Sequence, residues 1–157
     1  MKSSVKLVIL AAALGIAWAG PGTSYAQDAL AVITKRQDAM KEQGKSTAAI
    51  KAYTEDKADL AAARAAGAQL LASMPTIPSL FPQKTSMADY PGKSYAKPEI
   101  WAQWDKFNEG VKSATAAVQT FNALLAAGDK AAITAAFGKL GGEACGVCHT
   151  PFRERKT

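Results

Sequence analysis

The sequence predicts an all-α protein, an antiparallel up-down four-helix bundle with a long proline-rich connection between its second and third helices. Alanine is abundant whereas valine and isoleucine are sparse, and this balance favours closely packed helices over pleated sheet. Apolar residues recur at helical spacing in four segments that glycine or proline separates. The 157 residues, 48% of them hydrophobic, are enough for one packed domain.

The first 26 residues are predicted to be a secretory signal peptide that is cleaved off. Lys2 and Lys6 form a short basic start, residues 5–18 are nearly all apolar, and Ser24-Tyr25-Ala26 provides a small-x-small cleavage site. The apolar run is shorter than the roughly 20 residues of a membrane-spanning helix. Cleavage leaves residues 27–157 as a single domain with no membrane anchor. The formal net charge of this domain is lower than the +6 of the full chain, because two lysines are removed.

The first two helices are expected to be separated at Gly44. The first covers residues 28–43, and Gly44 is a natural stop. The second is expected to begin at Ser46, whose hydroxyl suits an N-cap, and to end at Pro75. The residues assigned to the inner seams of these helices are Leu30, Ile33, Gln37 and Met40, then Ile50, Tyr53, Leu60, Gly67, Leu71 and Met74.

A crossing segment between Pro75 and Pro98 precedes the third helix. It is too long for a simple helical hairpin, so we expect it to wrap one end of the bundle with Leu80, Phe81 and Tyr90 tucked in. The third helix is expected from Pro98 to Gly128. Its inner seam is expected to hold Ile100, Trp101, Trp104, Phe107, Val111, Val118, Phe121 and Leu125.

The fourth helix is expected to open at Asp129, whose carboxylate suits a helix start. Gly141-Gly142 weakens this helix locally or admits a bulky group. Its inner side is expected to hold Ile133, Phe137, Leu140, Cys148 and Phe152.

The chemistry is concentrated in Cys145-Gly146-Val147-Cys148-His149, which contains both cysteines and the only histidine of the chain. On a helix these two sulfurs and the imidazole converge on one flat object. A haem meets that demand, because two thiols can form thioethers with its vinyl groups while the imidazole binds iron axially. The motif therefore predicts one covalently attached haem c with its iron.

Two other interpretations of these residues stay open. A Cys145–Cys148 disulfide suits an oxidising compartment, although the thioredoxin-type motif belongs at a strand-to-helix turn of a sheet fold. A zinc ion would find three of its usual four ligands and no second Cys or His cluster. Without haem, the chain would be a thiol redox protein or a structural helical bundle.

Further segments match the pattern of a known family. They are Phe152-Arg153 after the haem motif, Arg36-Gln37 with Met40, Leu80-Phe81-Pro82, and residues 97–101, Lys-Pro-Glu-Ile-Trp. Together with the haem motif in the last of four helices, they resemble the cytochrome c prime family of bacterial periplasmic proteins. The resemblance covers essentially all of residues 27–157. It implies a periplasmic location, Cys145 and Cys148 as the thioether attachments, and His149 as the proximal iron ligand.

The resemblance also assigns roles to two arginines. Arg153, one turn after His149, matches a basic residue beside the proximal imidazole, where its charge would lower the basicity of that ligand. Arg36 matches an arginine near the haem propionates, where a guanidinium can pair with a carboxylate. An ordinary last-turn arginine and an ordinary surface arginine are the alternatives for Arg153 and Arg36.

Met40 distinguishes two branches of the family. In the low-spin branch, of the cytochrome c-556 type, a methionine here binds iron through its thioether, whereas five-coordinate members carry an apolar residue and leave iron open to small gases. A methionine that only fills the core is the alternative. Met40-Lys41 followed by Gly44 looks more like the low-spin branch, while Arg36 is typical of the five-coordinate members.

Two functions follow from the resemblance. The first is an electron carrier with His149 and Met40 on iron, which meets redox partner proteins transiently. The second is a protein that binds nitric oxide or carbon monoxide at an open distal haem face. Neither is an enzyme, and the sequence shows no nucleophile–base pair and no carboxylate dyad. Scattered lysines without an aromatic platform exclude nucleic acid as the expected partner, and family members often form homodimers through their first two helices.

Overall fold

The computed structural model describes residues 21–155. Most of the predicted signal peptide, residues 1–20, lies outside the described residues, and the placement of the cleavage site stays a prediction. None of the described helices is long and apolar enough to cross a membrane. The elements in order are α1 (Pro21–Thr54), α2 (Leu60–Ser73), the 3₁₀ helix η1 (Met74–Leu80), α3 (Glu99–Ala102), α4 (Trp104–Ala127), α5 (Lys130–Leu140), the π-helix η2 (Gly141–Gly146) and α6 (Val147–Phe152).

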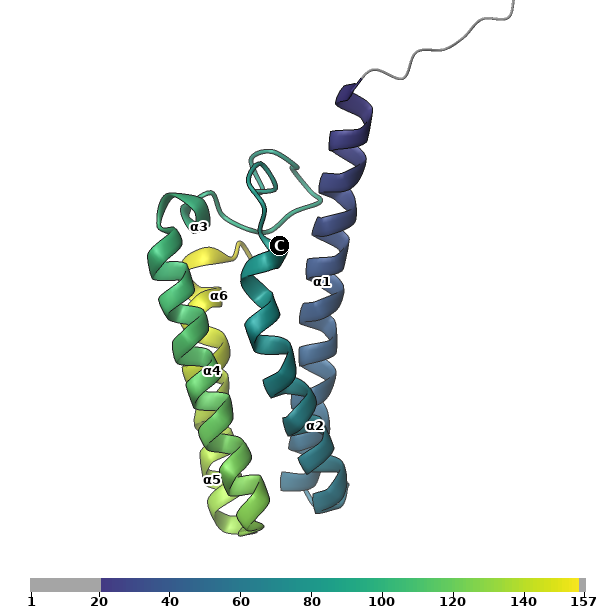
Figure 1. The fold of residues 1–157 in the computed structure, drawn as a ribbon. Coiled ribbons are helices and arrows are strands. Elements are labelled where there is room, and N and C mark those ends of the chain that lie inside the picture. Colours follow the sequence, from purple (N-terminus) through teal and green to yellow (C-terminus); the bar gives the residue numbers. More distant parts are fainter. Residues whose placement is uncertain (1–20, 156–157) are drawn as a thin grey trace, which may run out of the picture.

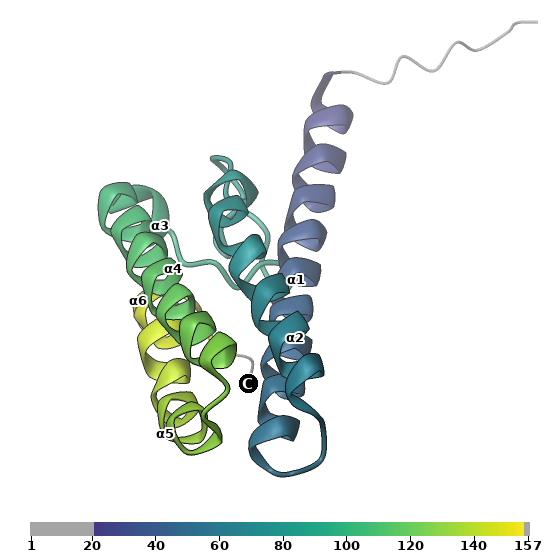
Figure 2. The same ribbon diagram turned by 60° about the horizontal axis from the view of Figure 1, so that its bottom comes forward.

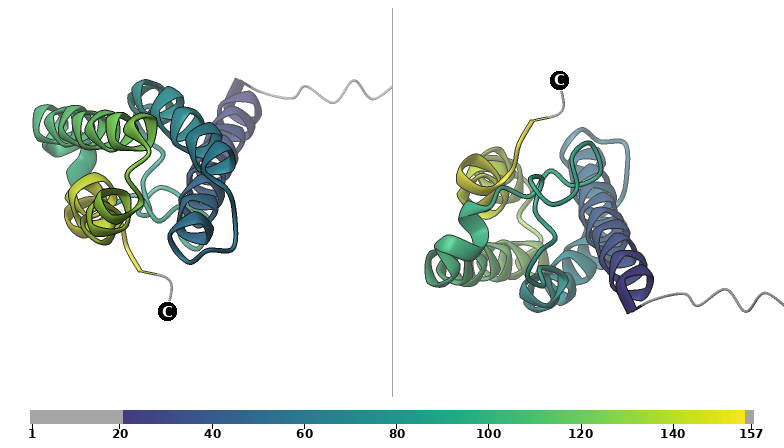
Figure 3. Two further views of the ribbon diagram at one scale, coloured as in Figure 1. Left: turned by 90° about the horizontal axis from the view of Figure 1, so that it is seen from below. Right: turned by 90° about the horizontal axis from the view of Figure 1, so that it is seen from above.

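The described chain forms the predicted antiparallel up-down four-helix bundle. α1 and α2 make one helical hairpin, and α4 makes the other with the continuous run of α5, η2 and α6 (Figures 1 and 2). α4 packs on both α2 and the last run, so it joins the two hairpins. The crossing segment between η1 and α3 covers one end of the bundle (Figure 3).

The expected boundary at Gly44 and Ser46 is wrong, because α1 runs straight through both residues. Ser46 is buried and its hydroxyl donates to Gln69 Oε1 at 3.4 Å, so it packs against α2 instead of capping a helix. The chain turns later, at residues 55–59, where Asp56 has a φ of 59°. Asp59 is the observed N-cap of α2, with its carboxylate accepting from the Ala62 amide at 2.7 Å. Gly44 costs the helix about 1 kcal/mol, and burial of the single seam that continues through it outweighs this cost.

Two core residues lie in a different helix from the one expected. Ile50 and Tyr53 belong to α1 and not to the second helix, and both are buried four and seven residues after Ser46. Leu30, assigned to the inner seam of the first helix, is 41% exposed. The periodicity therefore predicts buried residues of α1 correctly from Ile33 onward. It does not predict that the buried stripe excludes Leu30 and continues past Gly44.

The second half of the bundle follows the predicted caps. Gly128 adopts a left-handed φ of 83° at the end of α4, and its amide donates to Leu124 O. Asp129 accepts from the amides of Ala131 and Ala132 and so begins α5. The expected third helix is interrupted at Gln103, whose ψ of 46° separates α3 from α4.

The interruption at Gln103 places Trp104 at the start of α4, where it is 36% exposed and not on the inner seam. The local weakening expected at Gly141-Gly142 coincides with the first turn of the π-helix η2.

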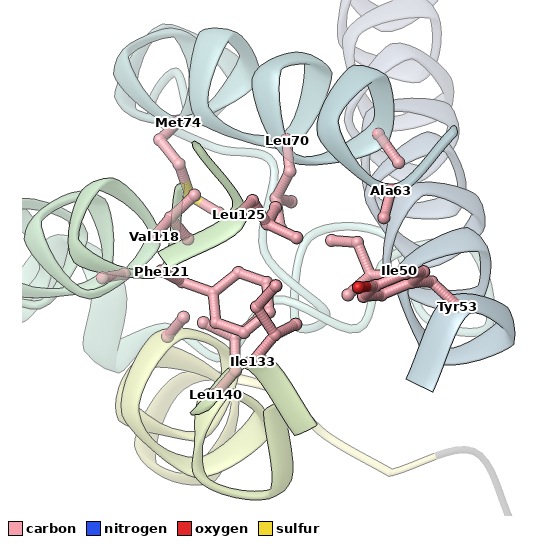
Figure 4. Close-up of a cluster of buried hydrophobic side chains, with 13 residues drawn as sticks. Ile50, Tyr53, Ala63, Leu70, Met74, Val118, Phe121, Leu125, Ile133 and Leu140 are labelled. Atoms are coloured by element: carbon pink, nitrogen blue, oxygen red, sulfur yellow. The ribbon is translucent and has the colours of Figure 1, made fainter. Parts of the chain in front are cut away.

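The main hydrophobic core lies between the two hairpins. Figure 4 shows its side chains, which come from α1, α2, η1, α4, α5 and η2 and include Ile50, Leu70, Met74, Val118, Phe121, Leu125, Ile133 and Leu140. A smaller cluster lies toward the crossing segment and contains Ala96, Ile100, Phe107, Val111 and Phe152. Residues of both clusters border one cavity.

Backbone hydrogen bonds join the C-terminal segment to the crossing. The Lys97 amide donates to Phe152 O at 3.0 Å, and the Glu154 amide donates to Tyr95 O at 2.8 Å. Leu80, at the end of η1, is buried, and Phe81 and Tyr90 in the crossing are half-buried, in agreement with the expectation that they tuck in. These bonds fix the residues on either side of Arg153.

Candidate functional site

A cavity of about 460 Å³ lies between α1, η1, α4 and the η2–α6 run. Its walls are mostly apolar, with contributions from Ile77, Phe81, Ile100, Phe107, Val111 and Phe152. Cavities of this size and composition are typical of cofactor sites. All six residues singled out in the sequence border it: Arg36, Met40, Cys145, Cys148, His149 and Arg153.

The cavity has α1 on one side and α6 on the other, in different hairpins of the bundle (Figures 1 and 2). Met40 comes from α1, while His149 comes from α6. Both side chains are half-buried. The tertiary fold thus brings a thioether and an imidazole that are more than a hundred residues apart to one apolar space.

The two cysteines are free and half-buried. Burial raises the pKa of both thiols, and the neighbouring Cys145 raises the pKa of Cys148 further. A redox-active Cys-x-x-Cys pair has a lowered thiol pKa, so this environment is unlike that of a thioredoxin-type site.

A zinc ion at the two cysteines and the histidine would lack a fourth protein ligand among the described residues. Within residues 21–155, the structure contains no group of three or more His, Cys, Asp and Glu side chains that is arranged to hold a metal ion. Structural zinc sites need four such ligands in tetrahedral geometry.

The surroundings of His149 favour the neutral imidazole. Burial lowers the pKa of the imidazole, and the positive charge of Arg153 lowers it further. Arg153 itself is exposed, and its amide donates to His149 O at 3.2 Å. A neutral imidazole keeps a lone pair for a metal ion.

Arg36 is only 5% exposed, and its guanidinium fastens the crossing segment to α1. Its two terminal nitrogens donate to Leu80 O (3.3 Å), Thr85 Oγ1 (3.3 Å), Thr85 O (3.0 Å) and Ser94 Oγ (2.9 Å). The guanidinium carbon also lies 4.5 Å from the centre of the Phe81 ring. Helix periodicity cannot predict this contact with the crossing, because it joins residues up to 58 positions apart.

Burial of Arg36 lowers its pKa to about 10. No carboxylate of residues 21–155 forms an ion pair with it. A cation at a cavity wall without an acidic partner favours an anionic group in that cavity.

The cavity fits a haem in three respects. Apolar walls match the faces of the macrocycle, and free thiols with a neutral imidazole match its covalent and axial attachment. Three cations, Arg36, Lys41 and Arg153, border the cavity with one anion, Glu154. Their charge complements two propionates.

Among the lining residues that were not candidate site residues in the sequence, Met74 stands out chemically. Met74, at the start of η1, is 3% exposed and borders the same cavity as Met40. The sequence placed it on an inner seam, and nothing in its spacing relates it to the haem motif. The cavity therefore presents two thioether side chains from two different elements.

Comparisons with known proteins identify the family of this chain. The family model described as Cytochrome C' matches residues 31–153. Cytochrome c-556 of Rhodopseudomonas palustris (strain ATCC BAA-98 / CGA009) is 29% identical over 128 residues, which are 80% of this chain and 84% of that protein.

Solved structures give the same result. Cytochrome c' from Rhodobacter Spheriodes is 30% identical with a TM-score of 0.72, covering 82% of this chain and 98% of that one. An NMR-validated structural model of oxidized R. palustris cytochrome c556 is 28% identical with a TM-score of 0.69, covering 80% of this chain and 98% of that one. The chain belongs to the Cytochrome C' family, whose members carry a covalently bound haem c and serve in electron transfer or gas binding.

Proposed function

We propose that this protein is a periplasmic electron-transfer protein whose single haem c has His149 and Met40 as axial ligands. The observation that carries the proposal is that these two side chains border one apolar cavity from different hairpins of the bundle. Cys145 and Cys148 would hold the haem through thioethers. Its relative cytochrome c-556, 29% identical, supports the low-spin branch.

When bound, the haem iron supplies one-electron redox chemistry. The thioether of Met40 favours the reduced metal and so raises the reduction potential. The charge of Arg153 keeps the imidazole of His149 a weaker base. The apolar side chains around the cavity reduce contact with water, which favours the iron state of lower charge.

In this proposal Arg36 acts on a propionate through its charge, while Arg153 acts on the imidazole of His149. The terminal nitrogens of Arg36 already donate to the crossing segment. Its Nε is the remaining donor that a propionate can use, since a guanidinium has five N–H groups.

The test is the optical absorption spectrum of the haem-loaded protein, recorded oxidised and reduced. We expect a low-spin spectrum with a sulfur-to-iron charge-transfer band that Met40→Ala abolishes. Met74→Leu is the matched control, because Met74 borders the same cavity and should leave the band unchanged. A band that survives Met40→Ala and disappears in Met74→Leu would reject Met40 as the ligand, and the absence of haem bands would reject the whole proposal.

Gas binding is the second candidate. It is favoured by a relative, 25% identical over 81% of this chain, whose structure is described as a cytochrome c' with ligand-controlled dimer dissociation. For this function Met40 would fill space near the haem without binding iron. The unsubstituted protein would then show a high-spin spectrum that shifts when nitric oxide or carbon monoxide is added.

Location and assembly have their own tests. Periplasmic export predicts a purified protein whose N-terminal residue is Gln27, and an intact Met1 would contradict cleavage of the signal peptide. A homodimer through α1 and α2 predicts twice the chain mass in sedimentation equilibrium. Transient redox partners predict electron-transfer rates that fall as the salt concentration rises, because the protein is basic.

A further inference from the structure

Gly110 lies on α4 directly opposite the second cysteine of the haem motif. It is buried, and a Cβ atom built on it would lie 3.1 Å from Cys148 Sγ and 3.9 Å from Val147 Cγ2. An ordinary contact of a Cβ atom is 3.4–4 Å, so the first distance is too short for an unstrained side chain. Because Gly110 has no side chain, there is space beside the sulfur of Cys148.

We propose that Gly110 is a positioning residue that allows Cys148 to form its thioether with the haem. This inference rests on the proposed function, since it concerns how the haem is attached. The neighbours of Gly110 on the same face of α4, Phe107, Val111 and Ala114, line the cavity. Any displacement of the sulfur by α4 therefore moves it relative to a haem held against these side chains.

The attachment reaction explains why the space beside Gly110 matters more once the C–S bond of Cys148 has formed. The thiol adds across a vinyl group: the S–H bond breaks, a C–S bond forms, and the hydrogen ends on the other vinyl carbon. The addition needs no oxidant or reductant. A free Cys148 side chain can rotate away from an added methyl group, but a thioether sulfur is held by the helix on one side and by the macrocycle on the other. The added methyl should therefore impair attachment more than folding.

The chain supplies a matched control for Gly110→Ala. Gly138 lies inside α5, is exposed, and has no atom within 4 Å of a built Cβ. Both substitutions replace a helical glycine and gain similar helix propensity. Only the substitution at Gly110 places a carbon against Cys148.

The experiment compares the unsubstituted protein, Gly110→Ala and Gly138→Ala after export with haem. Each protein is unfolded and treated with iodoacetamide, and the alkylated thiols are located by peptide mass. The pyridine haemochrome spectrum gives an independent count of unreacted vinyl groups. We expect the fraction of chains with a free Cys148 thiol to rise about tenfold in Gly110→Ala, as for overpacking by one methyl group, and to stay unchanged in Gly138→Ala.

Complete thioethers in Gly110→Ala would overturn the inference while leaving the proposed function intact. Failure of the unsubstituted protein to carry haem would instead overturn the proposed function. If Gly110→Ala gives no folded protein, it is combined with Cys148→Ala, which removes the sulfur. Recovery of folded protein in the double variant supports the contact, and failure of the double variant overturns it.

Discussion

Replacing Arg36 with methionine tests whether the guanidinium holds the crossing segment on α1. The two shorter hydrogen bonds, 2.9 and 3.0 Å, contribute about 1.5 kcal/mol each, and the two at 3.3 Å contribute about 0.5 kcal/mol each. The contact with the Phe81 ring adds about 1 kcal/mol. Methionine keeps most of the apolar stem, so packing changes little.

Relief of the buried charge opposes this loss. Burial lowers the pKa of Arg36 from its ordinary value to about 10, which corresponds to about 3 kcal/mol of unfavourable desolvation. The net expectation is that Arg36→Met lowers the free energy of unfolding by about 2 kcal/mol. Urea denaturation followed by circular dichroism measures this change. Lys35→Met is the control, because Lys35 is the exposed neighbour on α1.

The substitution should also release the crossing locally. Lys84 and Lys93 are exposed in the crossing, so trypsin should cleave after them faster in Arg36→Met than in Lys35→Met. Replacing a buried charge with an apolar residue of similar size is neutral or stabilising in some proteins. If Arg36→Met were as stable and as protease-resistant as the control, the hydrogen bonds would not be what holds the crossing.

Two further predictions concern packing and electrostatics. Gly67→Ala would place a Cβ 2.5 Å from Leu125 Cδ1 at the α2–α4 contact, so we expect a loss of about 1–2 kcal/mol in urea denaturation, whereas Gly138→Ala should cause no loss. Hydrogen bonds from Ser86 lower the pKa of Asp89, so their stabilisation is present above the ordinary pKa of an aspartate and is lost as the pH falls through the lowered value. Ser86→Ala should raise the pKa of Asp89 in an NMR titration, and an unchanged pKa would contradict the assignment.

Much of the fold could be predicted because its signals are local. Gly128 ends α4 with a left-handed φ and Asp129 caps α5 with its own carboxylate, and both effects involve only neighbouring residues. The haem motif is likewise local, since its five consecutive residues share a helical stretch. The crossing was predicted because proline excludes a continuous helix there.

The first turn of the bundle was misplaced because a glycine is a weak stop signal. Gly44 costs the helix only about 1 kcal/mol, and burial of Ser46, Ile50 and Tyr53 along the following turns offsets that cost. The sequence around Gly44 does not reveal that α1 continues. Packing of α1 against α2 decides it.

The helical class, the haem attachment motif and the candidate site residues could all be predicted from the amino-acid sequence. Long-range packing sets three other features: Arg36 is buried beneath the crossing, Met74 borders the cavity together with Met40, and Gly110 leaves room for Cys148. Helix periodicity and capping depend on residues within one or two turns, and they can be found along the chain. The cavity depends on which helices pack together and how closely, and that is set by contacts between residues far apart in the sequence.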